Sequence, residues 1–115
     1  MGILLIVLVN VLLLVSGQLF WKVALNRHPF RSAPDIVHVL VQPPMLLGCV
    51  LFAVATIVWF YALSRYDLSR VYPLQSLAYV MGAIAGMIFF KETISTWQWL
   101  GMLLIIGGAV LVAKP

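Results

Sequence analysis

Charged residues are scarce in this sequence. Only 9% of its 115 residues are charged, and the acids number three, namely Asp35, Asp67 and Glu92. Hydrophobic residues make up 64% of the chain, whereas a soluble domain is roughly half apolar and about a quarter charged. This composition excludes an ordinary soluble domain and places the chain in a lipid bilayer. Its length suits one small domain, which we expect to cover residues 1–115.

The groups that carry out chemistry are equally scarce. A single cysteine, Cys49, excludes an internal disulfide, and no Cys/His grouping has the spacing of metal ligands. Paired carboxylates, a nucleophile beside a base and a glycine-rich phosphate loop are all missing. We therefore expect no enzyme activity, no cofactor and no metal. The net charge of +4 comes without a basic cluster, so we expect membrane lipid rather than nucleic acid as the partner.

Four long apolar runs dominate what remains. A helix needs roughly 20 apolar residues to cross about 30 Å of hydrocarbon. Four runs meet this requirement, at about residues 3–25, 45–63, 68–90 and 97–113. Each should be helical, because lipid cannot hydrogen-bond an open backbone. The sequence therefore predicts an all-α integral membrane protein with four transmembrane helices and both termini on one side.

The connections between the runs carry turn and capping signals. The longest one is rich in proline and leaves room for a short interfacial helix from Asp35 to Val41. Ser95 and Gln98 form a capping-box pattern that opens the fourth helix, and we expect Glu92 to act locally at that helix start. Aromatic residues that anchor a protein at the membrane surface are expected near the helix ends, namely Trp21, Tyr61, Tyr66, Trp97 and Trp99.

The basic residues do not fix the orientation of the chain. The seven Lys and Arg residues divide three against four between the two sides of the four-helix arrangement, and the positive-inside rule needs an asymmetry. Two interpretations follow. The chain inserts in either direction and pairs antiparallel, or a partner fixes its direction.

Polar side chains follow one face of the first predicted helix. Asn10, Leu14, Gln18 and Lys22 are spaced four apart, so they stay within roughly 120° of one another around the helix axis. A lysine near a helix end can extend to the lipid headgroups. A polar residue at membrane depth more often faces a cavity or a partner. Because Asn10 and Gln18 share the face of Lys22, we favour a wet interior face.

The third predicted helix repeats this pattern. Tyr72, Gln75, Ser76 and Tyr79 have the spacing of one helix face, and both substrate binding and interhelical packing suit them. Gly82 and Gly86 continue the face as a pair of small residues for close helix packing, and Gly101 with Gly108 does the same on the fourth helix. Our candidate substrate-binding residues are Lys22, Gln18, Asn10, Tyr72, Gln75, Ser76 and Tyr79.

Three segments in order carry a resemblance: "SGQLFWKVAL", "LSRVYPLQSLAYV" and "FFKETISTWQWLGMLLIIGGAVLVAK". Together they resemble the EamA-like, small-multidrug-resistance branch of the drug/metabolite transporter superfamily. The first-helix G-Q-L…K and third-helix Y-P-x-x-S-L patterns are most similar to the small subunits of the undecaprenyl-phosphate-aminoarabinose flippase. The likeness covers most of the chain and is least typical from Asn26 to Pro44. It implies a multi-pass transporter of the bacterial inner membrane that works as a homodimer or as a heterodimer with a similar small protein.

One departure from the branch bears on the ligand. Its drug pumps carry a membrane glutamate eight residues before the first-helix lysine, whereas this chain has Leu14 there, and its four predicted spans contain no acid. Lys22 and Gln18 suit a lipid phosphate better than a cation. We therefore expect a flippase for a polyprenyl-phosphate-linked sugar, with a groove between subunits. A small-molecule or drug exporter and a non-transporting scaffold subunit are the alternatives.

Overall fold

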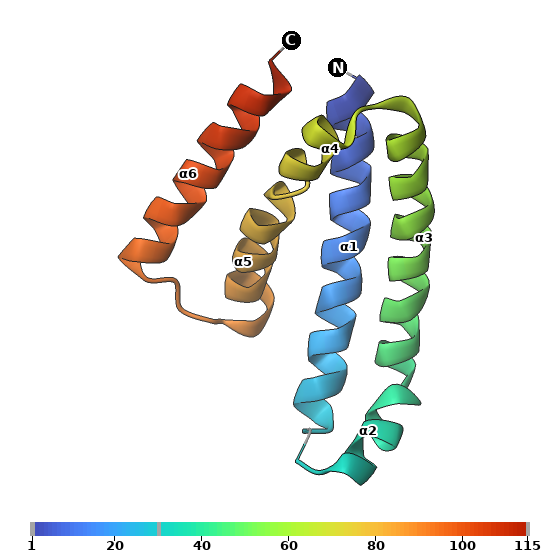
Figure 1. The fold of residues 1–115 in the computed structure, drawn as a ribbon. Coiled ribbons are helices and arrows are strands. Elements are labelled where there is room, and N and C mark those ends of the chain that lie inside the picture. The colour runs from blue at the N-terminus through green and yellow to red at the C-terminus, as the bar shows by residue number, and fades with distance from the viewer. Residues whose placement is uncertain (1, 30, 115) are drawn as a thin grey trace.

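The computed structural model describes residues 2–29 and 31–114, and every regular element in them is a helix. The elements are α1 (Gly2–Arg27), α2 (Ala33–Leu40), α3 (Pro43–Arg65), α4 (Leu68–Leu74), α5 (Leu77–Phe90) and α6 (Thr96–Ala113). Four segments are long and apolar enough to cross a membrane: α1, α3, the combined α4–α5 segment Leu68–Phe90, and α6. The predicted class of four transmembrane helices is confirmed. The start of α1 and the end of α6 lie at the same end of the bundle (Figure 1).

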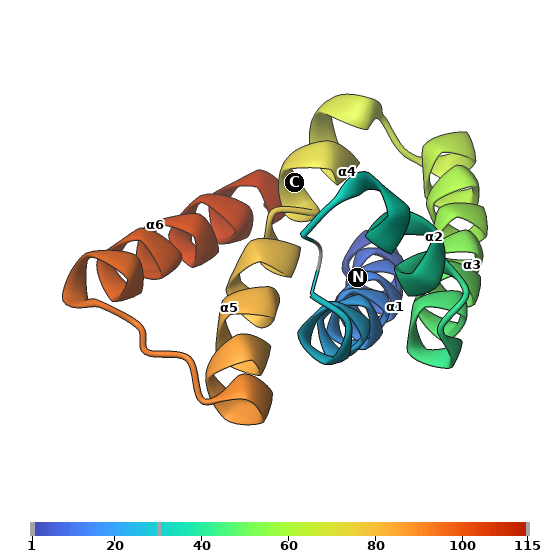
Figure 2. The same ribbon diagram turned by 90° about the horizontal axis from the view of Figure 1, so that it is seen from below.

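The helices α1 and α3 have the most extensive contact of any two helices, and they lie side by side in both ribbon views (Figures 1 and 2). Their backbones approach closely at Gly17 and Gly48, where a Cβ on Gly48 would lie 2.8 Å from the Gly17 carbonyl oxygen and would overlap the indole of Trp21. Small residues allow such an approach between membrane helices. The ring of Trp21 stacks on Phe52 at 5.5 Å between centroids, and its Nε1–H donates to the Met45 carbonyl at 3.2 Å. Trp21 therefore joins α1 to α3, a role beyond the membrane anchor we expected.

The third membrane segment is not one continuous helix, which corrects our expectation for residues 68–90. It divides into α4 and α5 at Gln75 and Ser76. Pro73, inside α4, has no N–H to donate and crowds the carbonyl of the preceding turn. The Gln75 N–H is shared between the carbonyls of Val71 and Tyr72, and the Ser76 N–H donates to the Pro73 carbonyl three residues earlier, all at 3.1 Å. These tighter bonds turn the chain between the two helices.

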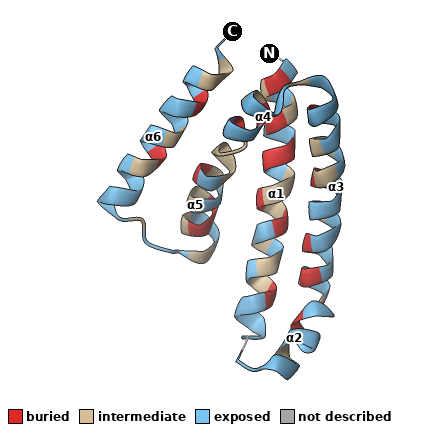
Figure 3. Ribbon diagram, viewed as in Figure 1, coloured by how far each residue is buried: buried red, intermediate tan, exposed pale blue. Residues whose placement is uncertain are grey.

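The helix α6 stands apart from the rest of the bundle (Figure 2). It contacts α4 and α5, and the guanidinium of Arg70 donates to the Ala113 carbonyl at 3.2 Å near its end. Most of its surface is exposed (Figure 3), and a Cβ on Gly101, Gly107 or Gly108 would meet no atom within 4 Å. In a bilayer these faces meet lipid or another chain. The dimer we expect along α6 stays a prediction.

Both capped helix starts follow the sequence signals. The Gln98 N–H donates to Ser95 Oγ at 3.2 Å and the Ser95 N–H donates to Gln98 Oε1 at 2.9 Å, which confirms the capping box. The short helix expected from Asp35 to Val41 is present as α2, with the bounds Ala33–Leu40, and its place at the membrane surface stays a prediction. The backbone N–H groups of Arg31 and Ser32 each donate to the Asp35 carboxylate at 3.0 Å, and these bonds lower the pKa of Asp35.

The glycine contact between α1 and α3 generates a stability prediction. Gly48→Ala should lower the free energy of unfolding by about 1–3 kcal/mol, because the added methyl group overpacks the crossing at Trp21 and Gly17. Gly107→Ala is the matched control, since its methyl group meets open space and alanine favours the helix. Unfolding of each purified variant by denaturing detergent in mixed micelles measures the difference. Equal stability of the two variants would contradict the crossing.

Candidate functional site

A groove of about 900 Å³ lies between α1 and the α4–α5 segment. It combines an apolar wall with amide, hydroxyl and charged side chains. The lining residues are Leu14, Val15, Gln18, Leu19 and Lys22 from α1, Phe52 from α3, the segment from Tyr72 to Ser76 without Leu74, Ala78, Tyr79, Gly82, Ala83, Gly86 and Phe90 along α5, and Glu92. Six of the seven candidate substrate-binding residues therefore line one groove, although the helix carrying four of them is interrupted.

Asn10 is the candidate that lies outside the groove lining. Its side chain is buried, with an exposed fraction of 1%. Its Nδ2 donates to the Ala55 carbonyl of α3 at 2.8 Å, and its Oδ1 accepts from Gln75 Nε2 at 3.0 Å. The Asn10 amide thus joins α1, α3 and the turn between α4 and α5. It positions Gln75, one wall residue of the groove, and directs neither of these bonds toward the groove itself.

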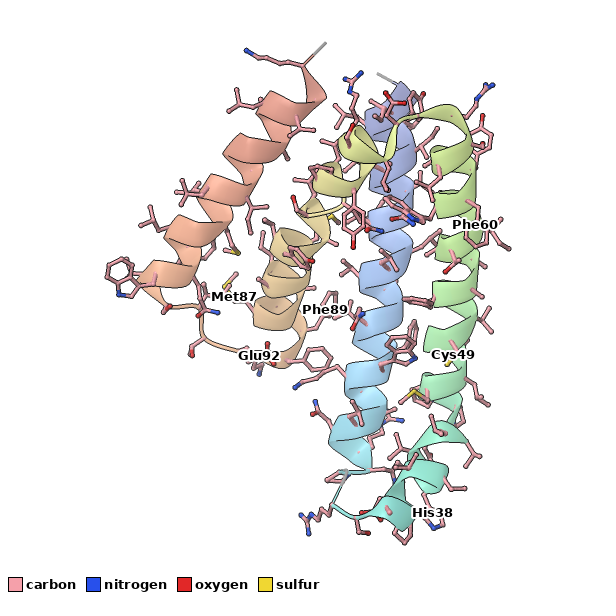
Figure 4. All side chains as sticks on the ribbon, viewed as in Figure 1. His38, Cys49, Phe60, Met87, Phe89 and Glu92 are labelled. Carbon is pink, nitrogen blue, oxygen red and sulfur yellow. The ribbon has the colours of Figure 1, made fainter. Side chains whose placement is uncertain are left out.

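The charged residues of the lining form an ion pair. Lys22 Nζ, near the end of α1, lies 3.7 Å from Glu92 Oε2, and about half of each side chain is exposed, 49% for Lys22 and 51% for Glu92. Lys22 and Glu92 are the only charged residues that line the groove within residues 2–29 and 31–114. The groove therefore presents a carboxylate and an ammonium group next to each other. Figure 4 shows Glu92 at the end of α5, where the chain leaves toward α6.

A left-handed turn brings Glu92 into the groove. The helix α5 ends at Phe90, and Lys91 adopts a φ of 54°, a conformation that residues with a side chain rarely adopt. The backbone N–H groups of Lys91 and Glu92 both point to the Gly86 carbonyl, the latter at 3.3 Å. The carboxylate then lies over Gly86, where a Cβ would stand 2.5 Å from Glu92 Oε1. Sequence reasoning missed this placement, since we expected Glu92 to act at the start of α6.

Gly82 and Gly86 of α5 also line the groove. Next to Gly82 there is open space, and the neighbour of Gly86 is the Glu92 side chain. Within the described residues no helix packs on either glycine, so our expectation that this pair admits another helix stays a prediction that needs a second chain. Without side chains at these positions, the groove keeps its width along α5. Its neutral polar groups are Gln18, Tyr72, Gln75, Ser76 and Tyr79, and their part in substrate binding stays a prediction.

The family model and the similar proteins that match this chain agree on one kind of membrane transporter. The pattern of the EamA-like transporter family matches residues 1–114. A protein of Aeromonas salmonicida named "Probable 4-amino-4-deoxy-L-arabinose-phosphoundecaprenol flippase subunit ArnE" is 36% identical over 97% of this chain and 96% of its own length. A Serratia proteamaculans protein carries the same name except that it is subunit ArnF. It is 31% identical over 90% of this chain and 85% of its own length. An "Uncharacterized transporter in cobO 3'region" of Sinorhizobium is 44% identical over 48% of this chain and 39% of its own length. No solved structure matches.

The strength of the hydrogen bond between Asn10 and Gln75 can be measured with a double-mutant cycle. Asn10→Leu should lower the free energy of unfolding by about 1–3 kcal/mol, because it leaves the buried Ala55 carbonyl and the part-buried Gln75 amide without their partner. In the double variant with Gln75→Leu, the two effects should differ from their sum by about 0.6–2 kcal/mol. Gln18→Leu, an exposed amide of the same helix, is the control and should change stability by about 0.5 kcal/mol or less. Additive effects of Asn10→Leu and Gln75→Leu would argue against the bond.

Proposed function

Because the chain belongs to the EamA-like transporter family, we propose that it carries the polar head of a polyprenyl-phosphate-linked sugar across the bacterial inner membrane. The observation that supports this most is Lys22, a cation in the wall of a groove that also holds amide and hydroxyl groups. The names of relatives that match nearly the whole chain describe subunits of a flippase for such a lipid. The phosphoundecaprenol in those names contains the anion that a lysine binds.

The groove residues suit the separate parts of such a lipid. The phosphate accepts a charge-assisted hydrogen bond from the Lys22 ammonium and a second one from the Gln18 amide. Sugar hydroxyls donate to and accept from Gln75, Ser76 and Tyr79 farther along the groove. The polyprenyl tail stays in the bilayer, because moving it into water costs about 0.8 kcal/mol per CH₂ group. The head therefore moves along a polar path while the tail never leaves lipid.

One observation favours export of a small cationic molecule as a second function. Glu92 contributes a carboxylate to the groove, and a carboxylate can hold a cation. Against this function, Leu14 occupies the position where the related drug pumps have their membrane acid, and it cannot bind a proton or a cation. Resistance to cationic dyes in cells that make the protein would support export, and its absence would support the flippase.

We further propose that the working unit contains two small chains in contact through α6. One copy leaves most of α6 exposed, and Gly101 and Gly108 stand seven residues apart with open space around them. The relatives are named as subunits, so the second chain is another copy or a similar small membrane protein. A second chain on this side would close the groove region into a path between subunits.

Gly108→Leu tests this assembly. The bulky side chain should block close approach of α6 to a second chain and lower the crosslinked fraction in native membranes. Gly107→Leu adds the same bulk one position away, on a different face of α6, and should leave more of the pair intact. If native membranes contain only monomers that are fully active, the path between subunits is wrong.

The proposed phosphate contact is tested at Lys22. In proteoliposomes that contain a labelled lipid-linked sugar, Lys22→Arg should keep part of the transport and Lys22→Glu should abolish it. The new carboxylate would stand beside Glu92, and two acids would repel the phosphate where salt screens weakly. Leu14→Glu should also impair transport, because it adds an acid to the same groove.

Arg27→Glu is the matched control for this experiment. It makes the same charge change on α1, at a residue outside the groove lining, and should leave transport near the wild-type rate. Rates are compared per amount of folded protein. Equal transport by the wild type and Lys22→Glu would mean that Lys22 reaches for the lipid headgroups, and the phosphate contact would be wrong.

A further inference from the structure

The Lys22–Glu92 pair has features of a site rather than of a structural bridge. Its two charges are separated by 3.7 Å and each side chain is about half exposed. An exposed pair of this kind contributes little to stability, and the lysine stem is long and flexible. The two side chains can therefore separate and bind other partners, and both line the groove.

Capping does not account for the position of Glu92. The start of α6 already has its reciprocal bonds between Ser95 and Gln98. Glu92 instead turns back over Gly86, and the turn requires Lys91 in a left-handed conformation, which is unfavourable for a residue with a side chain. The chain thus adopts a strained turn that places a carboxylate in the groove, and a functional role for this carboxylate is the natural reading.

The pair discriminates between kinds of head group by charge. A head group with a phosphate alone would take Lys22 from Glu92 and place its negative charge beside the carboxylate, which repels it. A head group with both a phosphate and a protonated amine would replace both partners at once, so that neither charge is left unpaired. The groove therefore favours a zwitterionic head group over an anionic one.

We propose that Glu92 is the residue that selects the substrate, binding the protonated amine of a lipid head group whose phosphate lies on Lys22. This assignment rests on the proposed transport of a phosphate-linked lipid. It adds the residue that recognises the amine, since the lipid in the names of the relatives contains an amino sugar. Acylation of the amine removes the positive charge, so the acylated lipid should lose the contact with Glu92 and keep the one with Lys22.

The test compares two polyprenyl-phosphate lipids, one with a free amino sugar and one with the same sugar N-acetylated. Binding is measured on the purified full chain in lipid nanodiscs. The wild type should bind the free-amine lipid about tenfold or more tightly than the acetylated lipid, the size expected for one charge-assisted contact. Glu92→Gln should bring this ratio close to one by weakening the free-amine lipid alone. Glu92→Asp keeps the carboxylate and should keep a preference.

Asp67→Asn is the matched control, because it also changes an acid to its amide, at an exposed N-cap outside the groove lining. It should leave the ratio unchanged. Equal weakening of both lipids by Glu92→Gln would mean that Glu92 only positions Lys22, and would overturn this assignment while the proposed function stands. If the wild type binds neither lipid, the proposed function falls and the assignment falls with it.

Discussion

The amide of Asn10 is the contact on which the shape of the groove depends. Amide groups in lipid need partners, because the surrounding hydrocarbon offers none. Asn10 meets this need by bonding Ala55 on α3 and Gln75 at the turn between α4 and α5. One side chain thereby fixes the distance between three membrane segments. The bond between Asn10 and Gln75 therefore also positions α5, which follows the turn and forms one wall of the groove.

The molecule divides into a tight pair and a loosely attached pair of helices. Gly17, Gly48 and Trp21 hold α1 and α3 together through backbone approach and ring packing. The groove lies where α1 meets the other half, and two polar links join α1 to that half: Asn10 with Gln75, and Lys22 with Glu92. Asn10 and Lys22 are twelve residues apart, so these links are separated by about 18 Å along α1. The Asn10 side chain is buried, whereas Lys22 and Glu92 are each about half exposed, so the ion pair opens more easily than the amide link.

The sequence predicted those features that depend on local pattern. Run length and hydropathy were enough for four membrane segments, and Ser95 with Gln98 was enough for the start of α6. Helical spacing also collected most of the candidate site residues on one surface, because α1 and the α4–α5 segment face each other. Pro73 is the sequence signal for the break in the third segment, because a proline inside a helix disturbs the hydrogen bonds of the preceding turn.

The remaining features depend on contacts between distant residues. The partner of Asn10 is 65 positions away, and the distance along the chain gives no hint of it. Glu92 reaches Lys22 because of a left-handed turn at a lysine, where a glycine would have been the usual signal.

The lengths of the helices have a further effect: α1 with 26 residues is about 39 Å long, whereas α6 with 18 is about 27 Å. This hydrophobic mismatch thins the bilayer beside α6 or tilts α1, and where the bilayer thins, a head group has a shorter distance of hydrocarbon to cross.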